Sequence, residues 1–185
     1  MKRSRYIVGG LALALMFVSG AIRVQSGQAS TQQRQMESEA RLQKEVRHVL
    51  VTQPFYSVFD NLAYSVNGDR VTLEGQVATP TLKSNAEKAV KSIEGVSAVD
   101  NQIEVLPTSP NDDRIRRAEF RAIYSAPGMQ KYAIQAVPPI HIIVKNGNVT
   151  LVGVVLNNID KTLALTRAKS VSGVFSVMDQ LTTEK

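Results

Sequence analysis

The chain carries one residue pattern twice, with the two occurrences 78 positions apart. The first occurrence consists of Val66, Val71, Thr72, Leu73, Gly75, Val77, Ala86, Gly95, Val96 and Val99. The second repeats the same residue types at Val144, Val149, Thr150, Leu151, Gly153, Val155, Ala164, Gly173, Val174 and Val177. A repeat of this length is too long for a solenoid unit, so it predicts two copies of one small domain joined in tandem.

The first copy, residues 40–106, has a regular predicted order of elements. Apolar residues recur at helical spacing from Leu42 to Leu50, and this helix should end before Pro54. Alternating residues around an Asn-Gly pair predict a β-hairpin over residues 62–77, followed by an amphipathic helix and a last strand. The predicted fold class is α+β, in which each copy runs helix, strand, strand, helix, strand and packs its helices on a three-stranded mixed sheet.

A linker and the second copy follow. Two prolines within residues 107–111 predict a short, stiff linker, and the second copy occupies residues 112–185. Its first helix matches the first copy at an offset of 73 instead of 78, which locates an insertion between Pro127 and Ile140. Asp112-Asp113 are expected to supply the N-cap of that helix.

Glycines occupy matching places in the two copies. Those next to asparagine predict hairpin turns, one residue out of step with each other. Those inside strands predict a bulge or a close approach of another backbone, and those after the second helices predict left-handed caps. The glycines of the turns, strands and caps are, in that order, Gly68 and Gly147, Gly75 and Gly153, and Gly95 and Gly173.

The N-terminus has the features of a secretory signal peptide. A basic start precedes an uncharged apolar run, and small residues offer a cleavage site after Ala29 or, earlier, after Ala21. The first of these sites makes residues 1–29 the leader. The alternative is an uncleaved anchor, because residues 6–22 just reach the lower limit for crossing a bilayer. Both alternatives predict export to the periplasm. Residues 30–39 are polar without periodicity and predict a flexible lead-in.

The charge of the chain gives no reason to expect a nucleic-acid partner. The whole chain has 22 basic and 16 acidic residues, for a net charge of +6. Residues 1–29 hold four of the basic residues and no acidic one, so the remaining 18 basic residues leave a net charge of only +2. Most of the basic character that would suggest nucleic-acid binding therefore belongs to the leader.

Residues with catalytic or metal-binding chemistry are scarce. The absence of cysteine excludes disulfides, thiolate nucleophiles and cysteine ligands for zinc. The two histidines, His48 and His141, lack a nearby His, Cys or carboxylate pair, so each is expected on the surface or on a strand face. No nucleophile elbow, phosphate loop or dinucleotide fingerprint is present. The sequence therefore predicts no enzyme, no metal site and no cofactor.

The repeated motif resembles the BON domain, a family of bacterial osmotically inducible periplasmic and nodulation proteins. The second copy has Val-Lys-Asn-Gly-Asn-Val-Thr-Leu-Val-Gly over residues 144–153, and the first has Val-Asn-Gly-Asp-Arg-Val-Thr-Leu-Glu-Gly over residues 66–75. After a helix, each copy continues with Gly-Val-x-x-Val. The resemblance covers both copies and implies a non-catalytic protein that associates with phospholipid or envelope surfaces, with a role in envelope stress protection.

The first helix of the second copy offers candidate residues for such a contact. Arg114, Arg117 and Arg121 share one helix face, and Tyr124 follows them. Three basic residues near an anionic surface are worth on the order of 3 kcal/mol. The alternative is a solvated face with ion pairs, such as one between Asp113 and Arg117.

Aromatic residues gather after the first helix of the first copy. Phe55, Tyr56, Phe59 and Tyr64 fall within ten positions. Such side chains could enter a membrane interface. The favoured alternative is that the segment folds back and covers a small core.

Two hypotheses for the partner follow. The first partner is an anionic phospholipid surface. The second is an envelope protein, with the two copies acting as a protein-interaction or structural element, because short sheets with unprotected edges invite pairing.

Overall fold

The computed structural model describes the backbone of residues 22–184 and the side chains of residues 32–184. The chain divides into two compact units, Met1–Glu37 and Ser38–Lys185, and both sequence copies lie in the second unit. The leader predictions for residues 1–21 fall outside the described residues. Within the described part, none of the helices combines the length and the apolar character that a membrane span requires.

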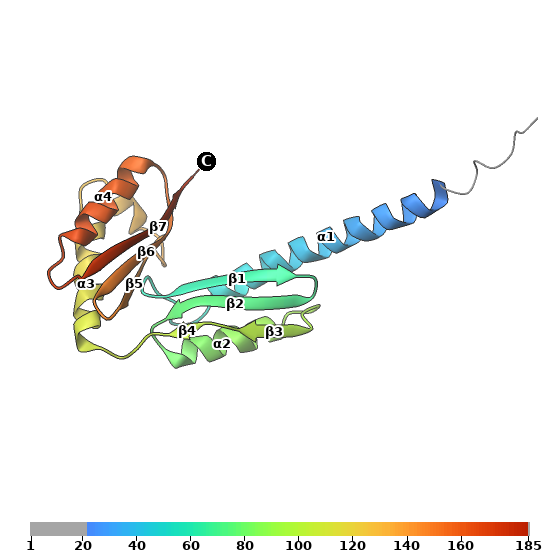
Figure 1. Cartoon of the computed structure of the whole chain (residues 1–185), viewed down its shortest axis with the longest axis horizontal. Helices are drawn as coiled ribbons and strands as arrows, with labels where there is room; N and C mark the ends of the chain where they lie inside the picture. Colours follow the sequence, from blue (N-terminus) through green and yellow to red (C-terminus); the bar gives the residue numbers. More distant parts are fainter. Residues whose placement is uncertain (1–21, 185) are drawn as a thin grey trace, which may run out of the picture. The chain divides into compact units, whose positions relative to one another are not determined.

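The first copy forms a mixed sheet that shares a core with two helices (Figure 1). Strands β1 and β2 make an antiparallel hairpin, and β3 and β4 both pair with β2 in parallel, so the third predicted strand is present but interrupted. Its elements are α1 (Ile22–Val51), β1 (Asn61–Asn67), β2 (Arg70–Val77), α2 (Pro80–Lys91), β3 (Ala98–Asn101) and β4 (Glu104–Val105).

The second copy repeats this arrangement with an unbroken third strand (Figure 1). Strands β5 and β6 are antiparallel, and β7 pairs with β6 in parallel. Its elements are α3 (Pro110–Tyr124), the 3₁₀ helix η1 (Gln130–Tyr132), β5 (Ile140–Lys145), β6 (Asn148–Val155), α4 (Asn158–Lys169) and β7 (Ser176–Thr183). The predicted α+β class, with two small sheet-bearing domains, is confirmed.

Each copy buries the apolar stripes that its periodicity predicted. In the first copy, Leu42, Val46 and Leu50 of α1 pack with residues of β2 and α2. In the second, Ile115 and Ile123 of α3 occupy the equivalent places. Burial of one helix face against one sheet face therefore accounts for both cores.

Residues 30–39 are helical, whereas the sequence predicted a flexible lead-in. This stretch is rich in glutamine, arginine, methionine and glutamate, which are good helix formers, and Gln33 Nε2 donates to Glu37 Oε1 at 3.1 Å. Side chains 32–38 are exposed. A helix without a buried face has no apolar period, so the pattern could not reveal it.

Helix α3 begins earlier than predicted. Ser109 is its N-cap, since the Ser109 side chain accepts a hydrogen bond from the N–H of Asp112. Pro110 fits the first turn because that position needs no N–H donor. The prediction that Asp112-Asp113 form the N-cap is therefore wrong, and residues 110 and 111 are helical instead of linker.

The two hairpin loops lie at matching positions, 78 residues apart, so the prediction that the turns are one residue out of step is wrong. Only the Asn-Gly pair is displaced, because Asn67 is the last residue of β1. In the second copy, Asn146 and Gly147 have φ values of 53° and 77°, which suits a type I′ turn. In the first copy the turn centres on Gly68 and Asp69, and Gly68 has a φ of 62°. Both loops therefore contain two residues, and neither copy has an insertion there.

A carboxylate from the preceding helix holds each turn. Asp112 is almost fully buried and accepts hydrogen bonds from the N–H groups of Asn146 and Gly147, both at 2.8 Å. At the matching place in the first copy, Glu39 accepts one from the N–H of Gly68 at 2.9 Å. These bonds satisfy turn donors and tie the first helix of each copy to its hairpin.

The strand glycines mark close approaches of backbone, which was one of the two predicted alternatives. A Cβ atom at Gly75 would lie 2.1 Å from the carbonyl oxygen of Asn61, and one at Gly153 would lie 1.9 Å from that of Pro139. Any other residue would collide with the neighbouring strand. Left-handed glycines follow α2 and α4, as predicted, at Gly95 and Gly173.

A segment of the first copy completes the core of the second. Val58 is 7% exposed and belongs to the second copy's hydrophobic cluster, and Phe59 packs against the same cluster. The Phe59 ring centroid lies 6.3 Å from that of Phe120 in an edge-to-face arrangement. The carbonyl oxygen of Val58 also accepts a hydrogen bond from Ile142 N–H at 2.8 Å. Of the four aromatic residues, Phe59 therefore covers the core of the other copy, Tyr56 and Tyr64 pack on the core of their own copy, and Phe55 is exposed.

Asp60 fixes the conformation of this segment. Its side chain is 2% exposed and accepts hydrogen bonds from Ser57 N–H and Ser57 Oγ, and from Ala78 N–H at 2.7 Å. A buried carboxylate with several donors is well satisfied and rigid. The segment is therefore anchored to the first copy while its apolar side chains enter the second.

Replacing Phe59 with alanine is expected to destabilise the second copy, although Phe59 belongs to the first. Loss of a half-buried aromatic ring should cost roughly 2–3 kcal/mol. Hydrogen exchange should then accelerate more at the amides of β5 and β6 than at those of β1 and β2. Phe55→Ala is the matched control, because Phe55 is 86% exposed. Equal acceleration in both copies would contradict the packing across copies.

Candidate functional site

A cleft of about 540 Å³ lies where the aromatic segment of the first copy meets α3. This volume is typical of sites for small organic ligands. We call it the arginine–aromatic cleft and define it by its lining residues. These are Tyr56–Phe59 of the first copy, Arg117, Phe120 and Arg121 of α3, and Ala133, Gln135, Ala136 and Pro138 of the loop before β5.

Helical geometry separates the two faces of α3. Ile115, Glu119 and Ile123 recur every four residues and are fully buried. Arg117 and Arg121 are also four residues apart, but they lie on the opposite side and are exposed. The helix therefore places two guanidinium groups along the same edge of the cleft.

Arg114, the third predicted arginine, lies apart from the cleft and is used by the fold. Its Nη1 donates to the carbonyl oxygen of Ser172 at 3.2 Å, and its Nη2 donates to Asn111 Oδ1 at 3.1 Å. The equivalent residue of the first copy, Arg41, donates to the carbonyl oxygen of Glu94 at 3.2 Å. The same bond in both copies indicates that this arginine joins the two helices of its domain.

The acidic residues of α3 do not neutralise the exposed arginines. Asp112 binds the hairpin turn, and Asp113 pairs with the buried Arg116 instead of Arg117. Glu119 is buried. Among the residues whose side chains the structure describes, neither Arg117 nor Arg121 has an ion-pair or hydrogen-bond partner for its guanidinium group. The expected Asp113–Arg117 pair is therefore absent, and positive charge remains on the outer face.

Tyr124 does not reach the surface. Its side chain is 4% exposed, its hydroxyl donates to the carbonyl oxygen of Ile140 at 2.6 Å, and the N–H of Ile140 donates back at 3.2 Å. Burial raises the pKa of Tyr124 well above its ordinary value. Its ring lies 4.9 Å from that of Phe120, so Tyr124 supports the wall of the cleft from behind.

Two exposed apolar side chains flank the cleft in sequence. Phe55 precedes Tyr56 and is 86% exposed, and Ile134 follows Ala133 and is 83% exposed. Phe55 also has a φ of 68°, a conformation that bulky residues rarely adopt.

Glu119 is a buried acid that the sequence analysis did not single out. It is 0% exposed, and neither of its carboxylate oxygens has a partner in the part of the chain with described side chains. Desolvation raises the pKa of Glu119 from 4.5 to about 8. The sequence did indicate that this position is buried, because the offset of 73 aligns Glu119 with Val46, a core residue of the first copy.

Glu119 should make the stability of the second copy depend on pH. Its pKa is 4.5 when unfolded and about 8 when folded, so its proton-linked stabilisation is complete below pH 4.5 and is lost as pH rises to about 8. The loss is on the order of 1.4 kcal/mol for each pKa unit. Glu119→Val, which copies Val46, should remove this dependence and raise the denaturation midpoint at neutral pH. An unchanged pH dependence in Glu119→Val would contradict the assignment.

The two histidines lie outside the cleft. His48 is exposed on α1. His141 stacks on Tyr56 with ring centroids 5.5 Å apart, and burial lowers the pKa of His141. Across the described residues, no three His, Cys, Asp or Glu side chains gather as a metal site would require.

The family model of the BON domain matches residues 38–107 and 129–185. The chain belongs to the BON domain family. The matched segments fall on the two copies, which are therefore tandem BON domains. Helix α3, which carries Arg117 and Arg121, lies between the matched segments, so the match by itself says nothing about the cleft arginines.

Other comparisons are less informative. No curated protein matches the chain. Two solved structures of CdsD, a structural protein of the type III secretion system of Chlamydia trachomatis, are similar at 12% identity. One covers 78% of this chain and 94% of its own with a TM-score of 0.30. The other, the C-terminal domain, covers 77% and 96% with a TM-score of 0.32. Scores this low carry no argument about function.

Proposed function

We propose that the chain is an exported, non-catalytic BON protein that associates with anionic phospholipid surfaces of the cell envelope through its second domain. The observation that carries the proposal is the pair Arg117 and Arg121, exposed along an aromatic-lined cleft that no acidic residue lines. Export rests on the predicted leader. The BON family match supports a binding role instead of catalysis.

The expected interaction is weak and sensitive to salt. Two arginines near an anionic surface supply on the order of 2 kcal/mol, and screening over about 10 Å at moderate salt reduces this. Phe55 and Ile134 would add apolar contact, because exposed side chains of this kind enter the headgroup region readily. Charge and apolar contact together suit reversible attachment to a membrane surface.

Changing both Arg117 and Arg121 to glutamate should lower the fraction of protein that co-sediments with phosphatidylglycerol vesicles by about tenfold or more at low salt. Binding of the unaltered protein should fade as salt is added. Arg114 is left unchanged, because its bond to Ser172 belongs to the fold.

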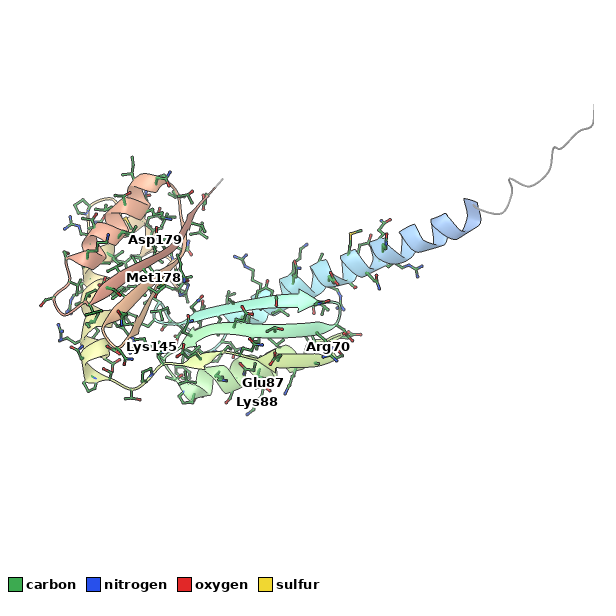
Figure 2. All side chains as sticks on the ribbon, viewed as in Figure 1. Arg70, Glu87, Lys88, Lys145, Met178 and Asp179 are labelled. Atoms are coloured by element: carbon green, nitrogen blue, oxygen red, sulfur yellow. The ribbon has the colours of Figure 1, made fainter. Side chains whose placement is uncertain are left out.

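The matched control is Arg70→Glu with Arg167→Glu. Both residues are exposed on other elements, and Figure 2 labels Arg70 at the start of β2. The control changes the net charge by the same amount and should bind vesicles better than the α3 variant. A folded, unaltered protein that fails to bind at low salt would rule out the proposal.

The second candidate is a protein-interaction or structural role in the periplasm. Exposed apolar side chains at and near the start of β7 favour it, since Phe175 is 85% exposed and Met178 is 57% exposed. Figure 2 labels Met178 on β7. However, at Leu181 the backbone N–H and carbonyl oxygen on the outer edge of β7 already have hydrogen-bond partners. The N–H of Leu181 donates to Asp179 Oδ1 at 2.9 Å, and its carbonyl oxygen accepts from Lys161 Nζ. Strand addition at this point would have to displace both bonds.

A further inference from the structure

The arginine–aromatic cleft has two chemically distinct parts, which restricts what can fill it. Val58, Phe59, Phe120 and Pro138 form an apolar surface. Arg117 and Arg121 lie along the same helix as Phe120 and leave their guanidinium groups unpaired among the described side chains. No carboxylate lines the cleft. A ligand that fits both parts therefore combines an anionic end with an apolar body.

The apolar part is held in place by contacts on both sides. Phe59 and Phe120 contact each other edge to face, and Phe120 packs on the buried Tyr124. The segment that carries Phe59 is fixed by Asp60 and by the bond between Val58 and Ile142. Partly exposed aromatic rings that are already held in place lose little conformational freedom when a ligand covers them.

We propose that the cleft binds a single-chain anionic amphiphile, with its alkyl chain over Phe59 and Phe120 and its anionic group at Arg117 and Arg121. This proposal refines the proposed function and rests on the same site. The guanidinium fork suits either a carboxylate or a phosphate, so a fatty acid and a lysophospholipid share the required chemistry. A free phosphate would not use the apolar wall, and a neutral chain would not use the arginines. The cleft volume of about 540 Å³ suits one such molecule better than the broad surface that a protein partner needs.

The test is calorimetric titration of the full chain with dodecyl phosphate, kept below its micelle concentration. Saturable binding of one molecule is expected, about tenfold or more tighter than binding of dodecyl maltoside or inorganic phosphate. Laurate and a lysophosphatidylglycerol, titrated in parallel, show whether the carboxylate or the phosphate source is preferred.

Two variants separate this proposal from surface attachment. Ala136→Phe fills the cleft and keeps both arginines, so it should abolish saturable amphiphile binding but lower vesicle binding far less than the loss of Arg117 and Arg121 does. Changing Arg117 and Arg121 to glutamate should abolish both. Ala133→Phe serves if Ala136→Phe does not fold, and Ala40→Phe, at an exposed position on α1, is the control.

The failures of the two proposals can be distinguished. Vesicle binding without saturable dodecyl phosphate binding would overturn the amphiphile site and leave the surface role standing. Amphiphile binding that survives in folded Ala136→Phe and Ala133→Phe, or that dodecyl maltoside matches, would also overturn it. If the unaltered, folded protein binds neither vesicles nor dodecyl phosphate, both proposals are overturned.

Discussion

The packing of Val58 and Phe59 into the core of the second BON domain is the interaction on which the rest of the structure depends. It supplies part of one core from the other domain and extends the hydrogen bonding of β5 through Val58. It also creates one wall of the arginine–aromatic cleft. Without this packing the second core would lose part of its cover, and Arg117 and Arg121 would lie on an open helix face.

The second determining feature is the placement of the acids on α3. A helix with as many acidic residues as this one would normally carry ion pairs on its surface. Here Asp112 binds turn donors, Asp113 pairs with Arg116, and Glu119 is buried with a raised pKa. Because none of these carboxylates pairs with Arg117 or Arg121, both guanidinium groups are available to a ligand.

Local features were predictable from the sequence. The hairpins, the helix that ends before Pro54 and the strand glycines follow from turn chemistry, periodicity and backbone sterics, and the structure has all of them. The repeat doubled this evidence, because each element was visible twice. Arg117 and Arg121 could be placed on one face, since helical spacing is a local property.

Contacts between distant segments were not predictable. Nothing in the spacing of Val58 and Phe59 shows that they enter the other domain, and the aromatic segment could be expected only to cover some core. The sequence places Tyr124 among the candidates for surface contact, because it does not show that the Tyr124 hydroxyl bonds to both backbone groups of Ile140. Arg114 likewise looked equivalent to its neighbours, because its bond to Ser172 joins residues 58 positions apart.

The central claim is that the edge of this cleft is the surface that meets an anionic membrane. The most direct measurement is hydrogen–deuterium exchange of the full chain with and without phosphatidylglycerol vesicles. The account predicts added protection confined to residues 55–59, the C-terminal half of α3 and residues 133–138. Protection centred on the first domain's sheet or on β7, with none at α3, would contradict it.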